Sequence, residues 1–168
     1  KNEEYLKMDI HTKRNLELTE SIRNKERMYS LLWLLDETKT AMGGRLLKSW
    51  IESPIVDINK INHRYDIVAT LLEEFIQSEE LRKYLYDVYD LERLCGRISL
   101  GSATARDLIQ LKESLKVLPE INKILKSISY TQLPDVHDLY LLLENSLYET
   151  PPPTLKEGYL IKQGYNQE

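Results

Sequence analysis

The sequence predicts a mainly α-helical protein: an irregular helical bundle with long helices and one or two short β-strands near the ends of the chain. Three observations favour this class. Apolar residues recur at helical spacing over most of residues 40–148. Residues that cap helices stand before several of these segments. Alternation with a period of two is confined to residues 5–10 and 158–163, and no fixed repeat suggests a solenoid.

The composition is that of an ordinary globular domain. The chain has 168 residues, of which 42% are hydrophobic and 30% charged, so we expect one domain over residues 1–168. The net charge of -4 argues against a surface whose main role is to hold nucleic acid. A single cysteine, no signal peptide and no membrane-spanning run indicate a cytoplasmic protein that does not contact a membrane. Both ends look cut from something longer.

The first forty residues give weak signals. Residues 5–10 alternate and predict a short strand, whereas residues 12–18 fit either a helical turn or an extended stretch. Residues 21–27 are polar and predict a loop. The apolar run at residues 30–35 predicts one or two turns of helix.

Thr40 is placed to cap a helix that Pro54 ends. Its predicted inner face consists of Met42, Leu46, Leu47, Trp50 and Ile51. Gly43 and Gly44 are costly inside a helix but less so in its first turn, where the amides lack helical partners. We expect them to allow close packing of a neighbouring element; a mobile hinge is the second interpretation.

Three further helices follow. Asp57 is placed to cap the first, Ser78 begins a short tyrosine-rich helix that reaches Val88, and Asp90 is placed to cap a helix that ends near Gly101. The predicted apolar stripe of the first is Ile58, Ile61, Tyr65, Val68 and Leu72.

The strongest helical pattern covers residues 104–128 and would form a rod of about 36 Å. Leu108, Leu111, Leu115 and Leu118 repeat at intervals of three and four residues. Pro119 should kink or divide this helix. A last helix is expected over residues 134–148, before the helix-ending Pro151–Pro153.

No complete set of catalytic or metal-binding residues is visible. Residues 96–101 space two glycines as a Walker A loop does, but Ser102 and Ala103 stand where Lys and Ser or Thr are needed. The three histidines are far apart, Cys95 lies beside an apolar stripe, and the paired glutamates do not face each other on a helix. We therefore expect no enzyme, cofactor or metal within these residues.

The basic residues do not predict a nucleic-acid site. The densest group, at residues 11–14 and 23–27, is interleaved with glutamates that cancel much of its field. Tyr84, Tyr86 and Tyr89 lie among aspartates, which would repel a phosphate backbone.

Several stretches together resemble one family. They are NLEL at 15–18, SLLWLLD at 30–36, TKTAMGGRLLKSW at 38–50, DLER at 90–93, RDL at 106–108, TPP at 150–152 and GYN at 164–166. This ordered set covers nearly the whole chain and is similar to the core, or lever, domain (domain III) of the bacterial MutS family of DNA mismatch-recognition proteins. Ala41 departs from the proline that many relatives carry there.

The resemblance implies a structural and allosteric part of a larger machine. In that family the core domain links an ATPase to a DNA clamp, while the mismatch sensor, connector, clamp and ATPase are other domains. The sensor's Phe-x-Glu motif is absent, since the only phenylalanine, Phe75, is followed by Ile76 and Gln77. The full-length protein would bind ATP and Mg²⁺, hold mismatched duplex DNA, form a homodimer and act with a MutL-type partner.

The residues expected to matter are therefore structural. Leu108, Leu111, Leu115 and Leu118 form the seam of the rod, and Leu46 with Trp50 forms a packed junction. Arg93, Arg97, Arg106 and Asp107 either fix the angles between helices or are ordinary exposed charges. The alternatives are a freestanding helical protein-interaction module, a helical nucleic-acid binder, and a paralogue that does not act in mismatch repair.

Overall fold

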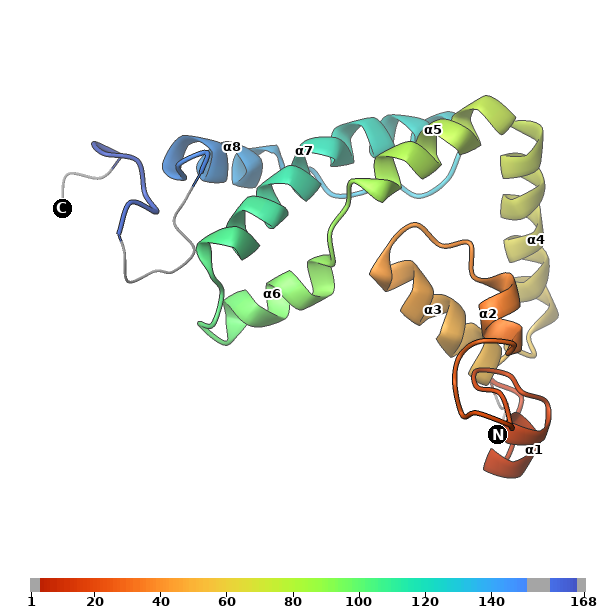
Figure 1. The fold of residues 1–168 in the computed structure, drawn as a ribbon. Helices are drawn as coiled ribbons and strands as arrows, with labels where there is room; N and C mark the ends of the chain where they lie inside the picture. The colour runs from red at the N-terminus through yellow and green to blue at the C-terminus, as the bar shows by residue number, and fades with distance from the viewer. Residues whose placement is uncertain (1–3, 151–157, 166–168) are drawn as a thin grey trace. The chain divides into compact units, whose positions relative to one another are not determined.

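The computed structural model describes residues 4–150 and 158–165. Its helices in these ranges are α1 (Ile10–Asn15), α2 (Leu31–Leu35), α3 (Ala41–Glu52), α4 (Ile58–Glu73), α5 (Phe75–Tyr86), α6 (Leu91–Ser99), α7 (Ala105–Ser127) and α8 (His137–Ser146) (Figure 1). The mainly α-helical class predicted from the sequence is confirmed. The helix-ending role predicted for Pro151–Pro153 lies outside the described residues.

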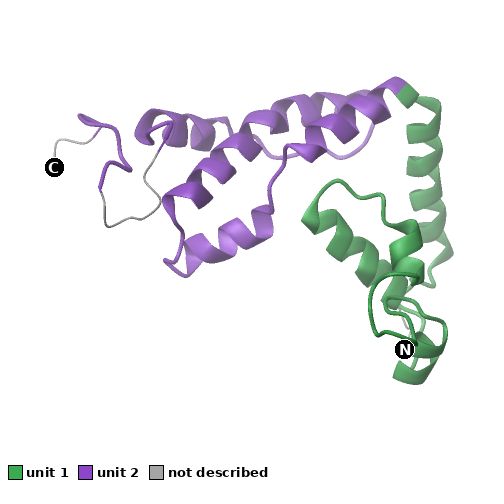
Figure 2. Ribbon diagram, viewed as in Figure 1, with its two compact units in different colours: residues 1–75 green, residues 76–168 purple. Residues whose placement is uncertain are grey.

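The chain divides into two compact units, residues 1–75 and residues 76–168 (Figure 2). Unit 1 holds α1 to α4, and unit 2 holds nearly all of α5 and the whole of α6 to α8. A single domain over residues 1–168 stays a prediction. None of the described helices is long and apolar enough to cross a lipid bilayer.

In unit 1, the short helix α2 packs against α3. The side chain of Ser30 accepts a hydrogen bond from the amide of Trp33 and so caps α2, which begins at Leu31. Backbone amides of Leu31 and Leu32 donate to the carbonyls of Glu17 and Leu18, each at 2.9 Å. The predicted loop and short helix at residues 21–35 are therefore confirmed, and backbone hydrogen bonds join the helix to the preceding segment.

The two predicted strands are reduced to single antiparallel bridges in the described chain, Tyr5 with Ile55 and Leu147 with Ile161. At the first, the extended stretch ends early because the carboxylate of Asp9 accepts a hydrogen bond from the amide of Thr12 at 2.8 Å. That cap starts α1 at Ile10, so the strand predicted to reach residue 10 is wrong in its second half. The ambiguous residues 12–18 are helical up to Asn15.

Helices α3 and α4 have the predicted caps but do not bury the predicted faces. Thr40 and Asp57 cap them, and neither helix contains a buried residue. On α4, Ile58 and Leu72 are 71% and 75% exposed, and Tyr65 and Val68 are also exposed. An apolar stripe predicts a face that another surface can bury, but it does not specify which surface.

Two helices begin at other residues than predicted, and the longest helix is not divided. Helix α5 begins at Phe75, earlier than residue 78. Helix α8 begins at His137, later than residue 134, because the carboxylate of Asp135 binds the His137 amide at 2.9 Å in a turn. Helix α7 continues through Pro119 as one helix of 23 residues, so a division there is wrong, and the alternative, a kink at Pro119, stays a prediction.

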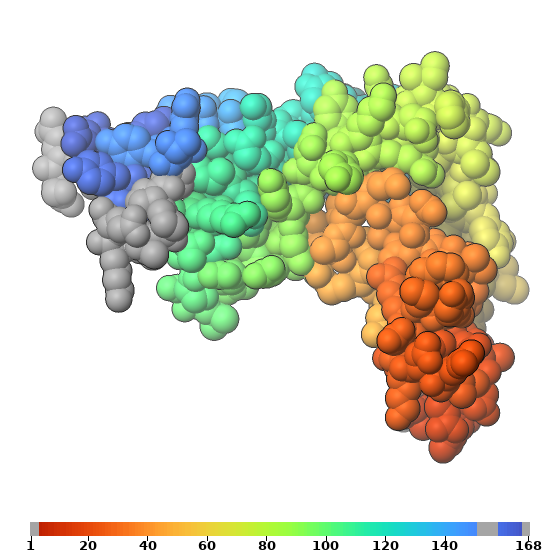
Figure 3. Space-filling model, viewed as in Figure 1, coloured from red at the N-terminus to blue at the C-terminus, as the bar shows by residue number. Residues whose placement is uncertain are grey.

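Unit 2 is built around α7, which packs against α6 and α8. Its core contains Leu94 of α6, Leu111 and Leu115 of α7, and Leu143 and Leu147 from α8 and its end. Side chains of α6 and α7, green to turquoise in Figure 3, fill the space between their ribbons. A long helix held on two sides is the main feature of this unit.

Candidate functional site

The first turn of α7 is fixed by a reciprocal pair of hydrogen bonds between Thr104 and Asp107. The Asp107 amide donates to the Thr104 hydroxyl at 3.3 Å, and the Thr104 amide donates to the Asp107 carboxylate at 2.7 Å. The hydroxyl also donates to the same carboxylate oxygen at 2.8 Å. This capping box satisfies amides that the helix leaves unpaired, and the T-x-x-D spacing allows it.

Arg97 connects the end of α6 to this capping box. Its Nε lies 3.1 Å from the Asp107 Oδ2, and its Nη2 donates to the Ser102 carbonyl at 3.0 Å. Burial would raise the pKa of Asp107, but the hydrogen bonds from Thr104 and the charges of Arg97 and Arg93 hold it below its usual value. Two of the four polar residues singled out in the sequence are thus in direct contact.

The predicted leucine seam lies in the core of unit 2. Leu111 and Leu115 are buried at 7% and 5% exposure, and Leu108 and Leu118 are half-buried against the same cluster. Their spacing of three and four residues puts them on one side of α7, where α6 and α8 both meet it. The seam therefore joins three helices.

Two buried polar residues of α7 escaped the sequence analysis. Ser114 is fully buried; its hydroxyl accepts from the Tyr89 amide at 2.9 Å and donates to the Gln110 carbonyl at 2.8 Å. Ser114 thereby holds Tyr89, which lies in the segment before α6, against α7. In the sequence, the burial of Ser114 could have been inferred from its position directly before Leu115, on the border of the apolar stripe.

The second is Lys112, whose side chain is only 9% exposed and whose Nζ lies 2.8 Å from the Glu144 carboxylate on α8. The hydrogen bond that the Lys112 ammonium donates to the Glu144 carboxylate raises the pKa of Lys112 and lowers the pKa of Glu144. The burial of Lys112 could likewise have been inferred from its position at the border of the apolar stripe, since it directly follows Leu111. This ion pair adds a polar connection between α7 and α8.

The remaining apolar candidates lie in unit 1. Leu46 and Trp50 are 53% and 40% exposed, so they form no buried junction within the described residues. The guanidinium of Arg64 lies 3.5 Å from the centroid of the Trp50 ring, a cation–π contact between α4 and α3.

Gly43 and Gly44 begin α3 close to the segment that precedes it. A Cβ on Gly43 would lie 3.1 Å from the Thr40 hydroxyl and 3.3 Å from the Thr38 Cβ, whereas one on Gly44 would make an ordinary contact with Thr38 at 3.4 Å. The Thr40 hydroxyl cannot easily withdraw, because it accepts the Gly43 amide at 3.0 Å. Gly43 is therefore closely packed, and the groups packed against it are the N-cap Thr40 of the same helix and the preceding Thr38.

A cavity of about 420 Å³ brings the polar candidates together. Arg93, Arg97, Arg106 and Asp107 all line it, together with Asp90 of the α6 cap. Arg93 and Arg106 are exposed, whereas Arg97 is half-buried. The sequence analysis singled out Arg93, Arg97, Arg106 and Asp107, but it did not predict that they line one cavity.

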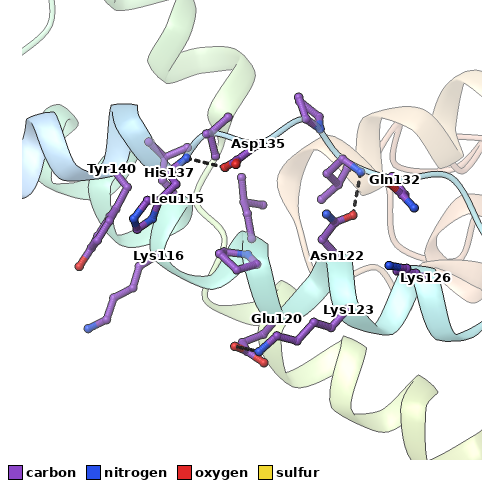
Figure 4. Close-up of a pocket in the computed structure, with 15 residues that line it drawn as sticks. Leu115, Lys116, Glu120, Asn122, Lys123, Lys126, Gln132, Asp135, His137 and Tyr140 are labelled. Atoms are coloured by element: carbon purple, nitrogen blue, oxygen red, sulfur yellow. Dashed lines mark hydrogen bonds and ion pairs between the residues drawn. The ribbon is translucent and has the colours of Figure 1, made fainter.

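A second concave surface, of about 700 Å³, follows the C-terminal half of α7 and the connection to α8 (Figure 4). Asn122 supports it by accepting the Leu133 amide at 2.9 Å, and Lys123 pairs with Glu120 at 2.7 Å. His137 with Tyr140 lies at one end in the view, and Lys126 at the other. Its charged groups do not converge on one point.

In the residues that the structure describes, no three His, Cys, Asp or Glu side chains are grouped so that they could hold a metal ion. What the junction of α6, α7 and α8 provides is a set of fixed helix contacts: a capping box, an arginine–carboxylate pair, a leucine seam and an ion pair whose lysine is buried. These features define the class as a helical structural domain.

Comparison with known proteins identifies which structural domain it is. The family model for MutS domain III matches residues 11–168. The chain is 53% identical over 173 residues to the DNA mismatch repair protein MutS of Bacillus subtilis (strain 168), covering 99% of this chain and 20% of that protein. It is 54% identical to the protein of the same name from Bacillus pumilus and 51% identical to that from Staphylococcus carnosus, covering 98% of this chain and 20% of each relative.

The chain belongs to the MutS family, as its domain III. It spans about a fifth of the length of the curated relatives that it matches. The family resemblance found in the sequence is therefore confirmed.

Proposed function

We propose that this domain is the structural and allosteric core of a DNA mismatch-recognition ATPase, and that it links the ATPase domain to the DNA clamp. The single observation that carries the proposal is α7, a helix of 23 residues that α6 and α8 hold on two sides. Such a helix spans about 35 Å and resists bending, so a displacement at one end reaches the other. The relatives' name, DNA mismatch repair protein MutS, supports mismatch repair over another paralogue role.

Chemistry belongs to the rest of the full-length protein in this proposal. ATP and Mg²⁺ would bind in the ATPase domain, and mismatched duplex DNA would bind through the clamp and sensor. The full-length protein would act in the cytoplasm as a homodimer with a MutL-type partner. The domain itself contributes the connection between these sites, and its net charge of -4 fits a role without a DNA surface of its own.

The proposal is tested by a coupling free energy in the full-length protein. The affinity for a mismatched duplex is measured with ADP and with a non-hydrolysable ATP analogue, and the ratio of the two dissociation constants reports the coupling. Leu118→Ala loosens the seam at a half-buried position, and Lys116→Ala, on the exposed side of the same helix, is the matched control.

We expect Leu118→Ala to change the ratio by about two- to thirtyfold, which corresponds to roughly 0.5–2 kcal/mol of coupling. The control should leave it unchanged. If Leu118→Ala lowers the melting temperature but leaves the ratio at its original value, the domain does not transmit the nucleotide signal.

A further inference from the structure

We propose that the cavity lined by Arg93, Arg97 and Arg106 is a socket for the carboxylate of an Asp or Glu side chain that the full-length protein presents from outside residues 1–168. The inference rests on the proposed function, because it assigns to the junction of α6 and α7 a contact with another part of that protein. The cavity measures about 420 Å³, enough for a side-chain head group.

The charge of the lining leaves one positive charge in excess. Three arginines face two aspartates, Asp90 and Asp107, which gives 3 - 2 = +1. Both carboxylates already accept backbone amides: Asp90 accepts that of Arg93 at 3.2 Å, and Asp107 accepts that of Thr104 at 2.7 Å. A ligand with one negative charge would balance the lining.

The donors that remain suit a planar anion. Within the part of the chain that the structure describes, neither Arg93 nor Arg106 forms an ion pair, and both side chains are exposed. The Nε of Arg97 is a buried nitrogen without a hydrogen bond, although it lies 3.1 Å from Asp107, because its N–H is not directed at that oxygen. Guanidinium groups bind carboxylates through two parallel hydrogen bonds, so arginine suits this role better than lysine does.

Local charge favours a protein carboxylate over a nucleic-acid phosphate. A duplex backbone is bound by rows of cations, whereas here the cations surround one cavity. Asp87 and Glu92 lie nearby in the sequence, and the chain as a whole is acidic. These charges would repel a phosphate strand that continues past the cavity but would tolerate a single side chain that enters it.

The test is zero-length cross-linking in the full-length protein. Arg106→Lys keeps the positive charge and supplies an amine that a carbodiimide can couple to a touching carboxylate. Arg82→Lys, at an exposed residue of α5 outside the cavity, is the matched control. Both variants are first shown by thermal melting to fold like the unsubstituted protein.

Mass spectrometry should find position 106 joined to an Asp or Glu outside residues 1–168 that the control does not reach. The cross-link should be lost when that acid is changed to its amide. Coupling only to acids within residues 1–168, or no coupling, overturns the proposal.

A second arm detects the nucleic-acid outcome. If Arg93→Gln with Arg106→Gln weakens duplex DNA binding more than Arg82→Gln with Lys83→Gln does, the cavity binds phosphate and the proposal is overturned. An unchanged nucleotide ratio in the Leu118→Ala experiment would reject the proposed function instead, so the two failures are distinguishable.

Discussion

Leu115→Ala should be among the most damaging single changes in unit 2. Leu115 is 5% exposed and lies in the cluster that joins α6, α7 and α8. Truncation removes three buried carbon atoms, worth about 0.8 kcal/mol each, or about 2.4 kcal/mol in transfer free energy. The cavity left behind raises the expected loss to about 3–4 kcal/mol.

The matched control is Leu46→Ala, the same chemical change at a side chain that is 53% exposed. Losing about half the transfer free energy and leaving no cavity, it should cost about 1 kcal/mol. Thermal and urea unfolding, followed by far-UV circular dichroism, measures both variants. If unit 2 unfolds on its own, Leu115→Ala should lower its melting temperature by at least about 12 °C. An equal loss in the two variants would refute a core centred on α7.

Three further predictions concern the polar contacts and the glycines. Asp107→Asn should destabilise the chain by about 1–2 kcal/mol at neutral pH, because an amide cannot replace both the cap and the ion pair. Because the pKa of Asp107 is lowered by folding, its contribution is present above the unfolded value of about 3.9 and is lost as pH falls through the folded value; the variant's stability should therefore fall less on acidification than that of the unsubstituted chain. Glu144→Gln should cost about 1–2 kcal/mol by removing the nearer of the two carboxylates that pair with Lys112, which leaves only Glu113 at 3.8 Å, whereas Lys112→Met should cost less, and urea titrations that rank them in the opposite order would contradict this. Gly44→Ala should stabilise α3 by up to about 1 kcal/mol, while Gly43→Ala gains nothing because its Cβ would crowd the cap; a thermal melt in which both gain equally would exclude close packing at Gly43.

The sequence predicted best where local chemistry decides the structure. Thr40, Asp57 and Asp90 each cap the helix that was expected after them, since an N-cap needs only a side chain and the next three amides. The seam of α7 was equally readable, because four leucines on one stripe leave a long helix one apolar side.

It failed where a partner surface decides. Helix α4 was expected to carry an apolar stripe, yet four of its five members are exposed in the described chain: Ile58, Tyr65, Val68 and Leu72. Lys112 and Ser114 were overlooked because their burial depends on α8 and on the segment before α6, which meet α7 only in three dimensions. The shared cavity of Arg93, Arg97 and Arg106 is likewise a product of how α6 turns back to α7.

The central claim is that α7 acts as one stiff rod in the working protein. Spin labels at positions 106 and 126, exposed residues near its two ends, would be about 30 Å apart along a straight helix. The distance between the two labels is measured by pulsed electron paramagnetic resonance in the full-length protein, once with ADP and once with a non-hydrolysable ATP analogue. The labels are attached in a background without other cysteines, which includes Cys95→Ser. The account predicts one narrow distance distribution that is the same in both states. A distribution that shortens or splits with nucleotide would show that the helix bends, as it could at Pro119, and would contradict the account.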